Sequence, residues 1–270
     1  MGRLSRGWQL TKLSFGVIRK DKEILLFPII SGMALIIMAA SFFGVYFFSF
    51  GLENLNVYLV AAFFIVFYFV SAFIVVFFNV ALASCAMLRL NGGDPTFSYG
   101  IKMASARLKY ILEWALLSAT VGLVLQAISS RSGMIGKVII GMIGFAWSVA
   151  TYFVVPIIAF EQLSPFKAIK RSATVLRSSW GEALISNLGI GLIFFLLALV
   201  GLIPLIVGFV IGGSFAIIVG ILITVVYWLS LAVLASAVSG VLLTVLYRHG
   251  TTGKLSEYYS EQVLQNPWKQ

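Results

Sequence analysis

Three side-chain amides lie within long apolar stretches of the sequence, where they are the residues best able to hold a polar ligand: Asn79, Gln126 and Asn187. An amide in hydrocarbon needs a hydrogen-bond partner, either on another helix or in a water-filled cavity. The first alternative makes these residues structural, and the second makes them the lining of a path for a small solute or lipid. Prolines also interrupt three apolar segments, at Pro28, Pro156 and Pro204. A proline within a helix leaves a backbone carbonyl without its N–H donor. Such carbonyls occur in ordinary kinked helices and also in the binding sites of transporters.

Six cationic side chains occupy matching positions before three apolar hairpins: Lys12, Arg19, Lys102, Lys109, Lys170 and Arg177. Gathered into rings at one membrane surface, they would attract anions or phospholipid headgroups. The alternative is that they only orient the chain, with their apolar stems along the helices and their charges in water. Glu23 follows Arg19 by four residues, which predicts a local ion pair on one helix face.

The residue types that most enzymes need are scarce. Cys85 is the single cysteine and His249 the single histidine, which excludes an intrachain disulfide and most metal or acid–base chemistry. The sequence has no glycine-rich phosphate loop, no paired intramembrane aspartates and no serine with a suitably placed base. We therefore expect a protein that is not an enzyme and holds no cofactor or metal.

The composition is that of a membrane protein. Of 270 residues, 61% are hydrophobic and 10% are charged, and the mean hydropathy is +1.05. A soluble domain carries about a quarter charged residues, so a soluble enzyme is excluded. About 20 apolar residues cross the roughly 30 Å of hydrocarbon in a bilayer. Six stretches qualify, near residues 24 to 50, 57 to 88, 111 to 130, 134 to 160, 183 to 210 and 213 to 247.

The distribution of positive charge predicts the orientation of these spans. Positively charged flanks are retained in the cytoplasm. With both termini inside, only Arg131 and Lys137 of the 19 Lys and Arg residues fall in outer connections. The predicted location is therefore the cytoplasmic membrane, as a multi-pass protein with both termini cytoplasmic. Orientation also accounts for the basic charge without a nucleic-acid partner.

The sequence repeats a layout three times, over about 4 to 88, 94 to 160 and 164 to 247, within a single membrane domain from 1 to 270. Residues 248 to 270 form a short cytoplasmic tail. Each unit begins with a basic amphipathic stretch, and Asp94-Pro95 and Ser164-Pro165 are favourable helix starts. We predict an all-α polytopic protein with six transmembrane helices in three hairpins, each preceded by a basic amphipathic interfacial helix. Small residues such as Gly141 and Gly189 predict close helix contacts.

Short motifs along the chain carry a resemblance to a known family. They are Gly7-Trp8, Val17-Ile18-Arg19, Asp21-Lys22-Glu23, Phe27-Pro28, Ser31-Gly32, Phe77-Phe78-Asn79, Gly92-Gly93-Asp94-Pro95, Ala146-Trp147-Ser148, Val154-Val155-Pro156, Lys170-Arg171-Ser172 and Trp180-Gly181-Glu182. Over essentially its whole length the chain resembles an uncharacterised bacterial and archaeal family of multi-pass membrane proteins, classed as a domain of unknown function. The resemblance implies the cytoplasmic membrane of a prokaryote and a topology, and it implies no chemistry.

Two functions fit these observations. The first is a passive conduit or carrier for a small solute or lipid, lined by Asn79, Gln126 and Asn187. It is favoured because internally repeated hairpin bundles often enclose a central site. The alternative is a non-transporting, membrane-organising or accessory protein, whose cytoplasmic basic helices bind anionic lipid or a partner. The lipid bilayer is the expected partner in both, and the sequence leaves the homo-oligomeric state open.

Overall fold

The computed structural model describes the backbone of residues 14–50 and 57–252, and the side chains of these ranges apart from 45–50, 57 and 178–188. The regular elements in these ranges are all helices, which confirms the predicted all-α class. A short helix over residues 14–20 comes first. It is followed by η1 (Lys22–Leu25), α2 (Leu26–Phe50), α3 (Val57–Leu90), α4 (Phe97–Ser105), α5 (Leu108–Arg131), α6 (Met134–Ala150), α7 (Val154–Glu161), α8 (Pro165–Val200), α9 (Ile203–Ile211) and α10 (Ser214–Thr252).

Six helical segments are long and apolar enough to cross a membrane: Lys22–Gly44, Tyr58–Leu90, Leu108–Arg131, Met134–Glu161, Gly189–Ile211 and Ser214–Thr252. The predicted number and order of spans are confirmed, with shifts at their ends. Only 6% to 22% of each apolar window is buried inside the protein. The other side chains are partly or fully exposed, as expected of helices that contact lipid. This is the architecture of a multi-pass membrane protein.

Two of the six segments contain a helix break. Residues 151–153 separate α6 from α7, and residues 201–202 separate α8 from α9. A proline follows each break in the first turn of the next helix, Pro156 in α7 and Pro204 in α9. Pro28 is likewise the third residue of α2. First-turn N–H groups have no intrahelical partner, so a proline there removes no hydrogen bond.

The break before α9 frees a carbonyl of α8 that α10 satisfies. The Leu202 N–H donates to the Leu199 carbonyl at 3.1 Å, so the Ala198 carbonyl lacks the donor that a continuous helix would supply. The indole Nε1 of Trp228 donates to the Ala198 oxygen at 3.1 Å. A backbone group that would otherwise be unpaired in an apolar environment is thereby satisfied.

The helices α9 and α10 also pack backbone against backbone. A Cβ atom on Gly208 would lie 2.7 Å from the carbonyl oxygen of Ala216. One on Gly220 would lie 2.6 Å from the carbonyl oxygen of Pro204. No side chain larger than hydrogen fits at these two positions without a backbone shift. The predicted contacts at Gly141 and Gly189 are wrong, because a Cβ atom there would have nothing within 4 Å.

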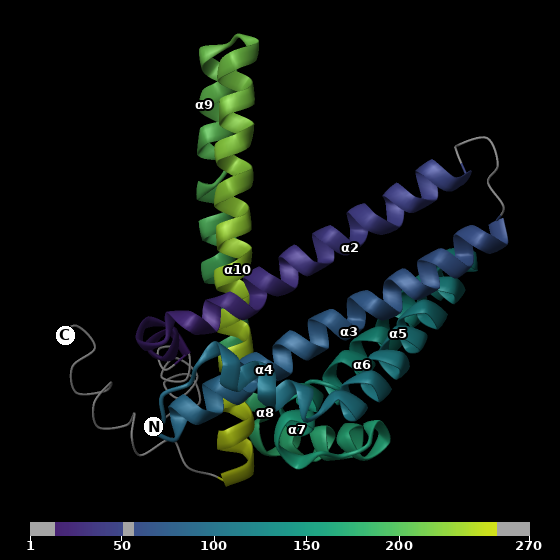
Figure 1. Ribbon diagram of the computed structural model, residues 1–270, viewed down its shortest axis with the longest axis vertical. Coiled ribbons are helices and arrows are strands. Elements are labelled where there is room, and N and C mark those ends of the chain that lie inside the picture. Colours follow the sequence, from purple (N-terminus) through teal and green to yellow (C-terminus); the bar gives the residue numbers. More distant parts are fainter. Residues whose placement is uncertain (1–13, 51–56, 253–270) are drawn as a thin grey trace.

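The packed core lies at one end of the molecule, around the C-terminal part of α3. Figure 1 shows α2, α4, α5 and α10 meeting α3 there, while α9 and the part of α10 beside it diverge from α2, α3, α5 and α6. Every residue from Val80 to Ala86 is buried. Most of these residues are small, so neighbouring helices approach α3 closely.

Three of the helices are longer than a bilayer crossing requires. The helices α3, α8 and α10 contain 34, 36 and 39 residues. At about 1.5 Å per residue they are about 50 to 60 Å long, against about 30 Å of hydrocarbon. Helices of this length either tilt in the bilayer or project beyond the hydrocarbon.

The short helix α4 is a separate element ahead of α5. Thr96 caps it by accepting a hydrogen bond from the Tyr99 N–H at 3.2 Å. Its apolar side packs on the protein: Ala104 is buried, and Phe97 stacks on Phe27 with ring centroids 5.1 Å apart. The apolar stripe of α4 is therefore covered by protein and does not face lipid.

The third unit differs from the second. Helix α8 starts at Pro165 after Ser164, as the sequence predicts, but it runs unbroken to Val200. No glycine or proline interrupts residues 166–180, so nothing in that sequence ends the helix. The third hairpin accordingly has no separate interfacial helix before it.

Candidate functional site

Arg89, in the last turn of α3, forms ion pairs with two carboxylates. The buried Asp21, just before η1, accepts hydrogen bonds from the Nε and Nη2 atoms of Arg89. Nη2 also donates to Asp94, in the loop after α3. The side chains of Arg89 and Asp21 are 14% and 6% exposed, whereas that of Asp94 is 89% exposed. The desolvated pair with Asp21 is therefore the one that fixes the chain before α2 against the end of α3.

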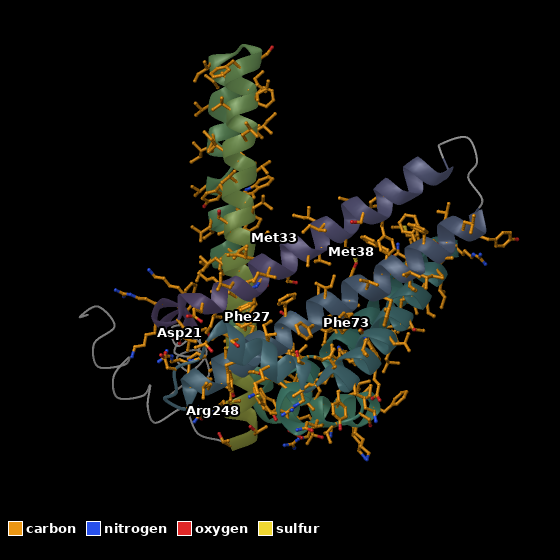
Figure 2. All side chains as sticks on the ribbon, in the orientation of Figure 1. Asp21, Phe27, Met33, Met38, Phe73 and Arg248 are labelled. Atoms are coloured by element: carbon orange, nitrogen blue, oxygen red, sulfur yellow. The ribbon has the colours of Figure 1, made fainter. Side chains whose placement is uncertain are left out.

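Two more contacts hold helix ends at the same place. Arg248 of α10 donates through Nη1 to the Leu90 carbonyl oxygen at 2.6 Å, at the C-terminus of α3. The Glu23 carboxylate accepts from the Phe97 N–H at 2.7 Å, at the N-terminus of α4. Glu23 thus binds the end of another helix, and its predicted pairing with Arg19 stays a prediction. Figure 2 shows Asp21 and Arg248 at the same end of the molecule.

A second polar cluster centres on Glu161, the last residue of α7. Its two carboxylate oxygens accept from Arg171 Nε of α8 at 2.9 and 3.0 Å. The Tyr247 hydroxyl of α10 donates to Glu161 Oε1 at 2.7 Å. Nearby, Arg107 Nε donates to the Ala159 carbonyl oxygen at 3.3 Å. The cluster joins α7, α8 and α10, so its charges are used in holding the core together.

Four of the predicted cations remain exposed at this end of the molecule: Lys102 of α4, Lys109 of α5, and Lys170 and Arg177 of α8. Among the residues that the structure describes, none of the four forms an ion pair with a carboxylate. We call these four residues the cationic surface. Arg19 is exposed as well and has a contact of its own, and Lys12 lies outside the described residues.

No contact joins the described cations into the two predicted rings of three, so the rings stay a prediction. Lys102 and Lys109 come from the second unit, and Lys170 and Arg177 from the third. The nearby carboxylates of Asp21, Asp94 and Glu161 are neutralised by Arg89 and Arg171. Glu23 and Glu113, the other described carboxylates at this end, are fewer than the four exposed cations, so the cationic surface keeps a net positive charge.

An open apolar groove of about 330 Å³ lies between α3 and α5. Its walls include Tyr68, Ser71, Ala72 and Val76 of α3, and Ser118 and Ala119 of α5. The groove is not among the predicted sites. Small residues on two neighbouring spans could have indicated it, because they leave a hollow where larger side chains would meet.

Two of the three predicted path-lining amides have side chains that the structure describes. Asn79 of α3 is half-buried and Gln126 of α5 is exposed. No hydrogen bond joins these two within the described part of the chain, and the side chain of Asn187 lies outside it. The structure does bring Asn79 close to the groove, because Asn79 follows Ala72 and Val76 at helical spacing on one face of α3.

Comparisons with known proteins add a family and no activity. A search of curated proteins finds no match. A family match covers residues 56–257, which include every candidate span except Lys22–Gly44. The motifs before residue 33 lie outside this range. By this match, the chain belongs to the family of unknown function designated DUF6159.

Proposed function

We propose that this protein is a non-catalytic, non-transporting membrane protein that organises its bilayer by binding anionic lipid through the cationic surface. The observation that carries the proposal is the division of charge at the core end. Asp21, Asp94 and Glu161 pair there with Arg89 and Arg171. The cations Lys102, Lys109, Lys170 and Arg177 stay exposed and outnumber the remaining described carboxylates, Glu23 and Glu113. The charge bias of the chain supports a cytoplasmic position for this end and for both termini.

The expected strength of this binding follows from the charges. Each cation near an anionic leaflet contributes about 1 kcal/mol at physiological ionic strength. The four residues of the cationic surface together supply about 4 kcal/mol, which is about a thousandfold preference for an anionic over a neutral surface. The interaction is electrostatic and exposed, so salt should weaken it.

The conduit function has weaker support. A polar path needs its hydrogen-bonding groups to face a shared space. Gln126 is exposed on α5, and the serines of the groove donate to carbonyls of their own helices, Ser71 to Phe67 at 2.7 Å and Ser118 to Ala115 at 3.2 Å. These features favour lipid binding over the passage of a polar solute.

The test compares two charge variants of the full chain in nanodiscs of controlled lipid composition. One variant changes the four cations of the cationic surface to glutamine, and the matched control changes Arg131 and Lys137, at the opposite end of the spans, to glutamine. Enrichment of phosphatidylglycerol over phosphatidylcholine around the protein is measured by mass spectrometry at low and high salt. We expect enrichment that falls with salt and is lost in the first variant alone.

Equal enrichment in the two variants, or enrichment that salt leaves unchanged, would contradict the proposal. The same samples in sealed liposomes test the conduit. Release of a trapped small solute by the wild-type protein, slowed by Asn79→Leu, would favour transport instead. Circular dichroism and size-exclusion profiles that match the wild type show that each variant is folded.

A further inference from the structure

We propose that the groove between α3 and α5 holds one acyl chain of an anionic phospholipid in the cytoplasmic leaflet. The proposal rests on the proposed function and adds where the lipid is bound. The groove of about 330 Å³ is open along one side, and its walls present carbon, because the hydroxyls of Ser71 and Ser118 donate to carbonyls of their own helices. A hydrocarbon chain is the ligand that such walls accept.

The groove is closed at its outer end. A Cβ atom on Gly122 of α5 would lie 2.7 Å from the Tyr68 hydroxyl oxygen, so the Tyr68 side chain reaches from α3 to α5 at that level. Below it, the small side chains of Ala72 and Ser118 leave the space open. An acyl chain entering from below would therefore end near Tyr68.

The groove lies at the depth of the cytoplasmic leaflet. Helix α3 begins at Val57, and about 20 residues cross the hydrocarbon, which places Val76 near the inner boundary. The wall from Tyr68 to Val76 therefore belongs to the inner half of the bilayer. Lys109 precedes Ser118 by nine residues on α5, or about 13 Å, which places its ammonium group among the inner headgroups.

The polar groups at the inner end match a phospholipid. Asn79 is half-buried one turn below Val76 on the same face of α3, where its amide can donate to an ester or phosphate oxygen. Lys109 is exposed beyond it and carries no carboxylate partner among the described residues. A hydrocarbon lining that ends in an amide and a cation complements an amphiphile with an anionic head. A transmembrane helix from a second copy of the chain is a poorer fit, because it would place apolar side chains at both ends of the groove.

The first experiment measures lipid retained by the full chain after exhaustive detergent exchange. Ser118→Phe fills the groove, and Val138→Phe, at a position of α6 that is 59% exposed, is the matched control. Native mass spectrometry should find one phospholipid bound per wild-type chain and per Val138→Phe chain. Occupancy in Ser118→Phe should fall at least tenfold. Equal occupancy in Ser118→Phe and the wild type, or none in the wild type, overturns the proposal.

A second measurement does not require a filled groove to fold. A photoreactive amino acid in place of Ala72 is activated in detergent after the purified protein has been delipidated, and the mass added to the protein is determined. A phospholipid adduct that survives delipidation before activation supports the proposal. Cross-linking to a second protein chain, or loss of the adduct after delipidation, overturns it.

The two proposals fail in different ways. In one outcome, Ser118→Phe removes the bound lipid while the four-glutamine variant still retains lipid with the same headgroup as the wild type. The proposal for the groove then stands, and the role given to the cationic surface is wrong. In the other outcome, Ser118→Phe keeps both its bound lipid and a salt-sensitive enrichment of anionic lipid equal to that of the wild type. The groove is then not the lipid site, and the proposal for the cationic surface stands.

Discussion

Replacement of Trp228 tests how the break between α8 and α9 is stabilised. Trp228 Nε1 is 3.1 Å from the Ala198 carbonyl oxygen, whose helical donor, Leu202 N–H, is turned to Leu199. In Trp228→Phe this carbonyl has no donor within the break. Orphaning a buried carbonyl costs about 1 to 3 kcal/mol in soluble proteins. Interhelical hydrogen bonds in a helical membrane protein average about 0.6 kcal/mol, with a maximum near 1.7.

We therefore expect Trp228→Phe to destabilise the protein by about 1 kcal/mol, roughly a fivefold change in the unfolding equilibrium. Tyr227→Phe is the matched control. The Tyr227 hydroxyl donates to the Leu197 carbonyl at 2.9 Å, but that oxygen also accepts from the Gly201 N–H at 3.2 Å. Its loss orphans nothing, so Tyr227→Phe should cost clearly less than Trp228→Phe.

The assay is reversible unfolding in mixed micelles of dodecyl sulfate and a mild detergent, with helix content followed by circular dichroism. An indole analogue with sulfur in place of the N–H, incorporated at Trp228, separates hydrogen bonding from ring packing. Hydrogen exchange at residues 201–206 supplies a local readout and should accelerate in Trp228→Phe. A cost in Tyr227→Phe equal to that in Trp228→Phe, or a sulfur analogue as stable as the wild type, would refute the role given to the indole.

Three other substitutions probe the contacts that organise the core. Gly220→Ala should destabilise the protein by about 1 to 3 kcal/mol in the same assay, because the new Cβ would lie 2.6 Å from the Pro204 carbonyl oxygen. Its control is Gly141→Ala, where the new Cβ would have nothing within 4 Å and stability should stay the same or rise. Asp21→Asn should lower the stability by about 3 to 5 kcal/mol, because it leaves Arg89 without its buried partner. Asp94→Asn, at an 89% exposed carboxylate, should lower it little. Equal losses of stability in the two variants would contradict the assignment of Asp21 as the buried partner. Tyr247→Phe should cost about 1.5 to 3 kcal/mol by removing the 2.7 Å hydrogen bond to Glu161, and a wild-type unfolding midpoint would show that the bond is not needed.

The spans were predictable from the sequence because hydropathy alone determines which segments enter a bilayer. The six expected stretches reappear as six candidate spans, and the breaks before Pro156 and Pro204 follow from the missing N–H of proline. The separation of α4 from α5 was harder to predict, because it depends on how α4 packs against α3. The unbroken course of α8 agrees with the absence of glycine and proline from residues 166–180.

The polar contacts were not predictable in the same way, because they join residues far apart in the chain. Local spacing pairs Glu23 with Arg19, yet Glu23 binds the N-terminus of α4. Asp21 and Arg89 are 68 residues apart, and Glu161 and Tyr247 are 86 apart. Of the candidate site, the lipid-binding role of the exposed cations stays a prediction. The groove depends on which small residues face each other across two spans, and a single sequence does not specify this.

The burial of α10 against α3 has a consequence for biosynthesis. Ala237, Val238, Val241 and Leu242 of α10 are almost fully buried, and Arg248 contacts Leu90 across 158 residues of sequence. At about 5 to 20 residues per second, a ribosome needs about 8 to 30 s to make that stretch. During this interval the earlier helices are already leaving the insertion machinery while one side of α3 is still uncovered. A nascent chain stalled before Ala237 would thus present that bare side to chaperones and membrane proteases.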